Sequence, residues 1–164
     1  MRKALYVFDD LDEADIVWLS RHGRSRDLAP GEVLIRAGEA VSELYFVTAG
    51  SFEVTTDAHD PIARLALGDA VGEMSFVEKR LPGASVTALE DSRVLAVPRD
   101  AIVAAFGHDT GFAARFYHAL AVFLSDRLRS ATDQEGEDEP EEVDDPQAGE
   151  RFTRLVAMLD GRAG

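Results

Sequence analysis

Between residues 33 and 97 the sequence consists of short β-branched, aromatic and aliphatic runs that are separated by turn-forming residues such as Gly38, Gly50 and Asp60-Pro61. One run, Phe52–Thr55, alternates apolar and polar residues with the period of two that is typical of a half-buried strand. Several short strands at close spacing are typical of a sandwich or barrel, and we predict a jelly roll. The predicted strands are Val33–Ile35, Leu44–Val47, Phe52–Thr55, Ala63–Leu67, Ser85–Leu89 and Arg93–Val97.

Helical patterns flank this region on both sides. Leu11–His22 has apolar residues at helical spacing, and Asp12 is a suitable N-cap. After the strands, Asp100–Phe106 predicts a short helix that Gly107 closes. The chain is therefore expected to be mainly β with helices at its edges.

A longer helix is predicted to begin after Asp109 or Thr110, either of which can cap it, and to end near Arg129. Its apolar residues recur every three or four positions and form a stripe along one face. This stripe either packs on the barrel or pairs with a second copy of the chain. The stripe consists of Phe112, Phe116, Leu120, Phe123, Leu124 and Leu128.

The net charge of −14 is concentrated behind this helix, because residues 133–150 hold ten acidic residues and no lysine or arginine. We predict a folded domain over residues 1–131 and a disordered acidic linker over 132–150, since the linker has little to bury. Residues 151–164 form a short amphipathic tail, in which Arg151–Leu159 either docks as a helix or stays frayed. The acidic tract and this tail are candidate contacts for a protein partner.

Composition excludes several classes of function. A pI near 4.6 disfavours binding to nucleic acid, which requires lysine and arginine to neutralise phosphates. No apolar stretch approaches the roughly 18 residues of a membrane helix, and the N-terminus lacks the apolar core of a secretory signal. The absence of cysteine excludes disulfides and thiolate metal sites and fits a cytoplasmic protein.

The histidines do not form a catalytic pattern. A metalloenzyme with a jelly-roll barrel needs two or three histidines that converge inside the barrel, and this sequence has no His-x-His pair. Only His59 lies in the strand region, and no Gly-x-Ser-x-Gly motif accompanies it. We therefore predict that the chain is not an enzyme. The four histidines are His22, His59, His108 and His118.

Two motifs occur in order along the strands. The first is Leu34–Glu39 followed by Leu44–Gly50, in which two glycines mark turns that need positive φ or close backbone approach. The second is Gly68-Asp69, then Gly72–Phe76, and later Ala84–Val86. The first motif resembles the opening hairpin of the cyclic-nucleotide-binding superfamily, and the second resembles the phosphate-binding cassette of that superfamily.

The resemblance covers about residues 9 to 130. Crp-type activators and kinase regulatory subunits share this domain. It implies an eight-stranded jelly-roll barrel with flanking helices and a long C-terminal helix. It also favours a homodimer formed through the Phe112–Leu128 helix, and a cyclic nucleotide, cAMP or cGMP, as the class of ligand.

Carried over residue by residue, the resemblance assigns Glu73 to the ribose hydroxyl, and Ala84 and Ser85 to the small positions beside the phosphate. The position that matches the family's arginine is Pro82, which has neither a charge nor an N–H group. Losing a charged hydrogen bond to a buried phosphate costs about 1.5 to 3 kcal/mol, which lowers affinity on the order of tenfold to a few hundredfold. The candidate ligand-binding residues are Gly72, Glu73, Met74, Ser75, Arg80, Ala84 and Ser85.

Each candidate also has a structural interpretation. Arg80 either reaches the pocket in place of the missing arginine or lies in a solvated loop. Glu73 either binds a ribose or caps the first turn of a short helix, and Ser85 is favoured as a structural hydroxyl.

Two functions fit these observations. The first, which we favour, is an interaction or assembly module whose cyclic nucleotide binding is weak or lost. The second is a sensor of cyclic nucleotide or another small anion that signals through its C-terminal helix. A Crp-type factor would continue into a helix-turn-helix module rich in lysine and arginine, whereas this sequence continues into the acidic tract, so DNA binding is not expected.

Overall fold

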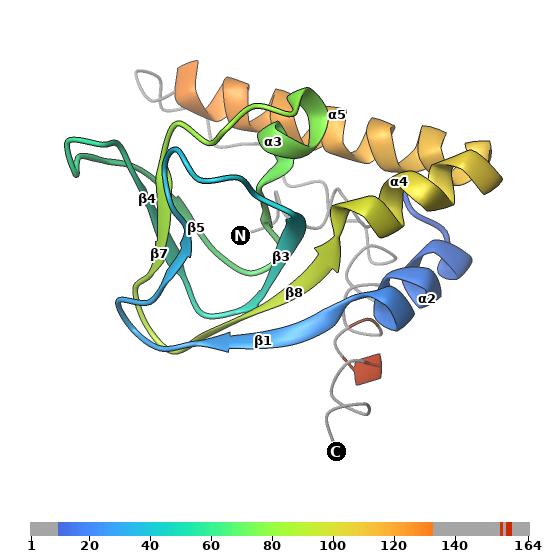
Figure 1. Cartoon of the computed structure of the whole chain (residues 1–164), viewed down its shortest axis with the longest axis horizontal. Helices are drawn as coiled ribbons and strands as arrows, with labels where there is room; N and C mark the ends of the chain where they lie inside the picture. The colour runs from blue at the N-terminus through green and yellow to red at the C-terminus, as the bar shows by residue number, and fades with distance from the viewer. Residues whose placement is uncertain (1–9, 133–154, 156, 159–164) are drawn as a thin grey trace.

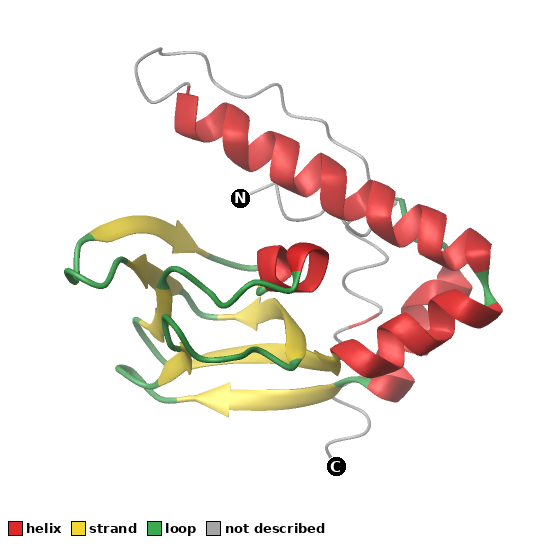
Figure 2. Cartoon of the chain, turned by 45° about the horizontal axis from the view of Figure 1, so that its top comes forward, coloured by secondary structure: helices red, strands yellow, loops and turns green. Residues whose placement is uncertain are grey.

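The computed structural model describes residues 10–132, 155, 157 and 158. Two four-stranded antiparallel sheets form the body of the domain. The strand order of the first sheet is β1 (Arg24–Leu28), β8 (Ser92–Pro98), β3 (Glu43–Ala49) and β6 (Ala70–Val71). The strand order of the second sheet is β2 (Val33–Ile35), β7 (Ser85–Ala88), β4 (Phe52–Thr55) and β5 (Pro61–Leu65). The helices gather at one end and one side of these sheets (Figures 1 and 2). The prediction of a mainly β jelly roll with flanking helices is therefore confirmed.

All six predicted runs are strands, and the structure adds two more. Strand β1, Arg24–Leu28, was missed because its charged, exposed residues carry little apolar signal; it lies at a sheet edge. Strand β6, Ala70–Val71, is too short to show a pattern. Strand β5, Pro61–Leu65, begins and ends two residues earlier than the predicted Ala63–Leu67, and an edge strand accepts proline as its first residue.

The paired strands β3 and β8 form the centre of the first sheet and are buried on both faces. Leu44 and Phe46 of β3 pack into an apolar cluster with the helices. Tyr45 and Val47, which alternate with them, pack into a second cluster between the two sheets. Burial on both faces explains why this strand reads as a continuous apolar run rather than an alternating one.

Four helices are described in residues 10–132: α2 Glu13–His22, α3 Glu73–Glu78, α4 Arg99–His108 and α5 Thr110–Thr132. The predicted cap is confirmed for α2, where Asp12 accepts from the Asp15 N–H in a capping box. Asp109 accepts from the Phe112 N–H at 3.0 Å and caps the start of α5. The prediction that Gly107 closes the preceding helix was wrong, because α4 continues through it to His108. None of the helices among the described residues is long and apolar enough to span a bilayer.

The apolar stripe of α5 faces the chain's own core. Phe112, Phe116, Leu120 and Phe123 are at most 3% exposed and belong to the cluster that covers β3 and β8, whereas Leu128 is 68% exposed. The interpretation of the stripe as core-facing therefore holds for its first part. The homodimer through this helix stays a prediction, and it would have to use the outer face.

Of the predicted acidic linker, residues 132–150, only Thr132 is described, as the last residue of α5, and the remainder lies outside the described residues. In the predicted tail, Leu155 is helical and fully buried in the same cluster as the α5 stripe. The rest of Arg151–Leu159, apart from residues 157 and 158, lies outside the described residues. A protein partner for the tract or the tail stays a prediction.

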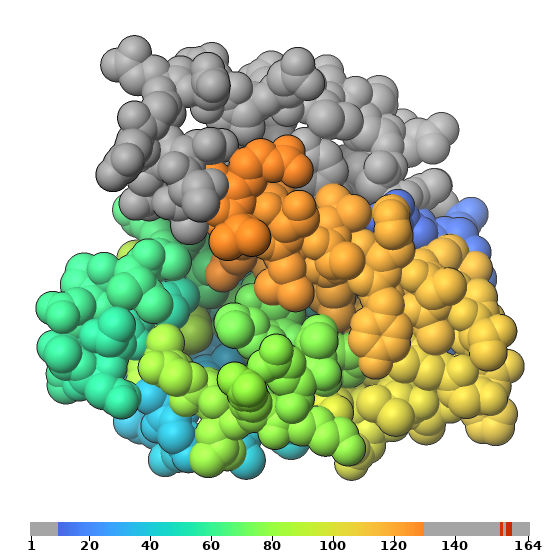
Figure 3. Space-filling view, turned by 90° about the horizontal axis from the view of Figure 1, so that it is seen from above, coloured from blue at the N-terminus to red at the C-terminus, as the bar shows by residue number. Residues whose placement is uncertain are grey.

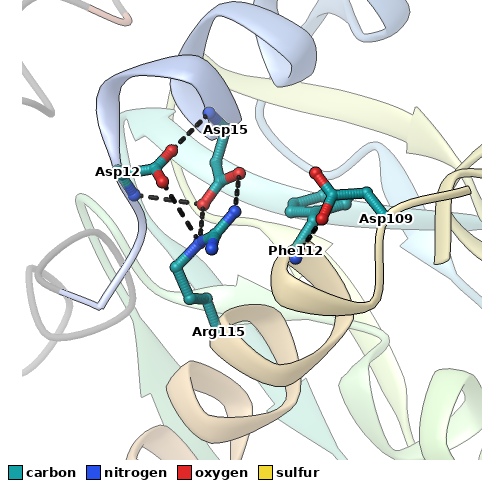
Figure 4. Close-up of polar contacts among 5 residues, drawn as sticks. All are labelled: Asp12, Asp15, Asp109, Phe112 and Arg115. Atoms are coloured by element: carbon teal, nitrogen blue, oxygen red, sulfur yellow. Dashed lines mark hydrogen bonds and ion pairs between the residues drawn. The ribbon is translucent and has the colours of Figure 1, made fainter.

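A buried ion pair joins the start of α5 to the start of α2 (Figure 4). The Arg115 guanidinium donates from Nε to Asp15 Oδ2 at 2.7 Å and from Nη2 to Oδ1 at 2.9 Å. Asp12 approaches the same Nε at 3.4 Å. The Asp15 side chain is only 4% exposed, so the bidentate Arg115 guanidinium supplies both of its side-chain oxygens with a hydrogen bond in a site that water hardly reaches.

Removing this pair should destabilise the domain. Removing one partner of a fully buried pair lowers the free energy of unfolding by about 3 to 5 kcal/mol. Because Arg115 is partly exposed, we expect a smaller loss of about 1 to 3 kcal/mol for Arg115→Ala. The matched control is Arg24→Ala, whose side chain is 70% exposed in its pair with Glu43 and should cost about 1 kcal/mol or less. Urea unfolding measures the free energy of unfolding of both variants. Equal losses of stability in the two variants would contradict the role assigned to the Arg115–Asp15 pair.

Candidate functional site

A cavity of about 450 Å³ lies against the second sheet, beside α3. This volume is within the range of roughly 300 to 1,000 Å³ that is usual for small-molecule pockets. Figure 3 shows the hollow bounded by the β4–β5 hairpin, the segment after α3 and the C-terminal part of α5. Most of the wall is aliphatic and includes Ile35, Val54, Ile62, Leu65, Val71 and Val86.

The second motif, Gly68-Asp69, Gly72–Phe76 and Ala84–Val86, is called the cassette below, and it brings the polar residues to this cavity. Gly72 precedes α3 with a φ of +89°, a backbone conformation that glycine adopts most readily. The turn therefore directs the chain into α3 with Glu73 as its first helical residue, and both residues line the cavity.

Glu73 is a buried carboxyl group at the wall of the cavity, with a side chain that is 8% exposed. Burial raises the pKa of Glu73 above its ordinary value, because desolvation disfavours the charged form. The Arg127 charge and backbone hydrogen bonds from Glu73 and Gly72 oppose this rise, whereas the Asp69 charge adds to it. The Arg127 Nη1 lies 3.9 Å from Glu73 Oε1, which is longer than a hydrogen bond. The carboxylate therefore has a nearby positive charge and retains capacity to accept hydrogen bonds.

In the segment where the resemblance places an arginine, Pro82 lines the cavity beside Ala84. The Pro82 carbonyl accepts from the Gly38 N–H at 2.8 Å, which fastens this segment to the β2–β3 connection. Arg80 also lines the cavity, but its side chain is 82% exposed and pairs with Glu78 at 3.3 Å. Arg80 thus lies at the solvent-facing rim.

Six of the seven predicted residues lie together at this cavity: Gly72, Glu73, Met74, Ser75, Arg80 and Ala84. Ser85 is not among the lining residues, and its hydroxyl accepts from the Ala37 N–H at 3.0 Å. This contact supports the structural interpretation of Ser85. Its role toward a ligand stays a prediction.

Arg127 of α5 lines the same cavity and was missed by the sequence reasoning. Its guanidinium carbon lies 4.9 Å from the centre of the Phe123 ring, a cation–π contact. The available signal was spacing, because Arg127 follows the buried Phe123 by four residues and so shares its helix face. Its position over a distant cassette follows only from the tertiary fold.

An aromatic cluster connects α3 to the long helices. The Phe76 ring of α3 lies 6.2 Å from Phe106 of α4, and 5.7 and 6.1 Å from Phe116 and Tyr117 of α5. Arg99, the first residue of α4, donates to the Phe76 carbonyl at 3.4 Å. The cassette helix and the helical layer therefore contact each other directly.

Among the described residues, no group of three or more histidines, aspartates and glutamates is arranged to hold a metal ion. Two of the histidines have structural contacts: His118 contacts Asp10 at 2.7 Å, and the His22 ring stacks on Trp18 at 4.2 Å. What the cavity offers chemically is an apolar wall with a buried carboxyl group and a guanidinium.

A family model, the cyclic nucleotide-binding domain, matches residues 25–109. Among curated proteins, the mouse voltage-gated delayed rectifier potassium channel KCNH5 is 34% identical over 103 residues, which is 62% of this chain and 10% of the channel. The matched region thus spans about a tenth of that relative.

Solved structures share the fold. A cyclic nucleotide-binding domain from Methylobacillus flagellatus has a TM-score of 0.73 at 17% identity and covers 86% of this chain and 85% of its own. The catabolite activator protein of Thermus thermophilus has a TM-score of 0.64 at 21% identity and covers 96% of this chain and 88% of its own.

The raised pKa of Glu73 predicts a dependence of stability on pH. The folded state holds this proton to higher pH than the unfolded chain does, so stability falls as pH rises through the raised folded pKa. The Glu73→Gln substitution removes this loss of stability at higher pH. We expect the Tm of Glu73→Gln to match that of the unaltered chain well below pH 4.5, the ordinary value, and to exceed it well above that pH.

The control is Glu78→Gln, whose side chain is 51% exposed at the rim, and it should follow the unaltered chain under both conditions. A Glu73→Gln variant that is less stable at neutral pH would mean that the ionised carboxylate is stabilising in place.

Proposed function

Because the chain belongs to the cyclic nucleotide-binding domain family, we propose that it is a non-catalytic regulatory module that acts on a protein partner, with cyclic nucleotide binding that is weak or lost. The family is a regulatory one, and residues of the cassette line the cavity. The observation that carries the proposal is Pro82 at the cavity wall, where the family's arginine would be.

The charges around the cavity support this proposal. Among the described residues, four charged side chains line it, and they form two pairs: Arg80 with Glu78, and Arg127 with Glu73. A cyclic phosphate would need a desolvated cation, but Arg80 lies largely in water and Arg127 lies beside a buried carboxyl group. A buried charge without a partner is costly, so we expect a phosphodiester to bind poorly.

Signalling from the cavity would pass to α5 by two contacts. Phe76 packs on Phe116 and Tyr117, and Arg127 of α5 reaches Glu73 directly. A change in the cassette thereby alters what α5 packs against. This arrangement suits a module whose output is the position of one helix.

The second candidate function is a sensor of cyclic nucleotide. It is favoured by the volume of the cavity, about 450 Å³, and by Glu73 at the position that matches the family's ribose ligand. The two functions differ in the affinity that they predict for cAMP and cGMP.

The partner that we propose is a second copy of the chain, bound through the outer face of α5. Apolar residues recur there at steps of three and four, the spacing of a two-helix seam. Tyr117 and Leu128 are 46% and 68% exposed, so part of this face is accessible to solvent. The outer stripe consists of Ala114, Tyr117, Ala121 and Leu128, and Leu124, which also packs against the chain's own core cluster, lies at its edge.

Calorimetric titration with cAMP and cGMP tests the proposed loss of affinity. We expect weak or undetectable binding by the unaltered chain and a gain on the order of tenfold to a few hundredfold in Pro82→Arg, since a guanidinium restores a charged hydrogen bond. Pro82→Ala is the matched control, because it removes the proline without adding charge, and should bind no better than the unaltered chain. Tight binding by the unaltered chain would favour the sensor instead.

Light scattering tests the proposed dimer. Leu128→Glu should reduce the apparent mass from that of a dimer to that of a monomer, because a carboxylate in an apolar seam is costly. Leu89→Glu, at a position that is 41% exposed outside α5, is the control and should remain dimeric. A monomeric unaltered chain would rule out this interface.

A further inference from the structure

We propose that the layer formed by α2, α4 and α5 has a docking site for one short amphipathic helix, and that the occupant of this site is the chain's own C-terminal segment, residues 151–164, anchored by Leu155. The inference uses neither the cavity nor the outer face of α5, so it stands apart from the proposed function.

Leu155 is buried in a part of the domain that is distant in sequence. It has a helical backbone, is 0% exposed and belongs to the apolar cluster that includes Ile16 of α2, Ile102 of α4 and Phe116 of α5. Residues 133–154 separate it from α5, and a chain of that length can span up to roughly 70 Å. The connection therefore does not force Leu155 into the cluster, and its own contacts must hold it there.

The described residues of the segment are buried as on an amphipathic helix. Leu155 is buried, Ala157 is exposed and Met158 is half-buried, and all three have helical backbone. Residues two positions apart do not share a helix face, whereas residues three apart are neighbours on it. In the sequence, Phe152 and Leu159 continue the apolar spacing three positions before and four positions after Leu155. The segment thus has one apolar face, with Leu155 at its centre.

A single leucine anchor makes the docking reversible. Burial of one leucine side chain favours the docked state on the order of ten- to a hundredfold. A free peptide held by such a contact binds weakly, but a covalent connection raises its concentration at the site to on the order of millimolar. Occupancy of about nine-tenths then requires a Kd of roughly 0.1 mM for the segment, tenfold below that concentration. A second copy of the segment, added as a peptide, can therefore compete for the site.

The charge of the segment suits this layer. Residues 151–164 hold three arginines and one aspartate, so the segment is positive in a chain whose net charge is −14. Leu11, which belongs to the same cluster as Leu155, is followed by the exposed residues Asp12 and Glu13. Opposite charges favour this occupant over an acidic segment.

A fluorescent synthetic peptide of residues 151–164 tests the site on the full chain, with anisotropy as the measurement. In the unaltered chain the connected segment occupies the site, whereas Leu155→Asp should release it, because a buried carboxylate is costly. We expect the peptide to bind the Leu155→Asp chain at least tenfold tighter than the unaltered chain. Ala157→Asp is the matched control, since it adds the same charge at an exposed position, and it should bind the peptide as weakly as the unaltered chain.

A urea unfolding transition shows whether each variant is folded. Where only Leu155→Asp is unfolded, Leu155→Ala takes its place in the titration. If neither variant folds, the segment is a fixed part of the core and the proposal is overturned. It is also overturned if a folded variant binds no peptide at millimolar concentration, or binds it no tighter than the unaltered chain does.

Hydrogen exchange at the Leu155 amide identifies the source of the occupant. An occupant from the same chain is independent of protein concentration, so we expect the protection of this amide in the unaltered chain to persist on dilution. Loss of protection on dilution would mean that a second copy supplies the segment, and would overturn the assignment to the chain's own C-terminus.

Discussion

The packing of one ring, Phe76, determines the geometry of the site. Helix α3 has six residues and no side-chain cap, so it is too short to be stable without tertiary contacts. Phe76 supplies them by packing on Phe106 and Phe116, and it is only 4% exposed. Because α3 begins at Glu73, the position of the buried carboxyl group depends on the helical layer.

The two halves of α5 are held differently. Near its start, Arg115 makes two short hydrogen bonds to a buried Asp15, at 2.7 and 2.9 Å. Near its end, Arg127 approaches Glu73 at 3.9 Å without a hydrogen bond of that kind. Charge-assisted bidentate pairs are the stronger kind of contact, so the ion pair near the start of α5 is the stronger of these two.

The sequence predicts this fold well where burial and spacing act locally. Strands such as β3 carry strong apolar runs, and the Gly72-Glu73 pair is recognisable through the resemblance of its segment to the family's cassette. Strand β1 was not predictable, because hydrogen bonds to β8 hold a charged edge segment that has no pattern of its own. Arg127 was not predictable as part of the site, because only the course of α5 across the barrel brings it to a cassette some fifty residues earlier in the sequence.

The positive charge nearest the buried carboxyl group comes from α5 instead of from the cassette. Any ligand that engages Glu73 must therefore compete with Arg127 or accommodate it, and either outcome changes the free energy of the α5 position. A ligand shifts a conformational equilibrium only by its difference in affinity for the two states. Here that difference would arise at one pair of side chains, Glu73 and Arg127, so recognition of a ligand and the response of the helix share the same contact.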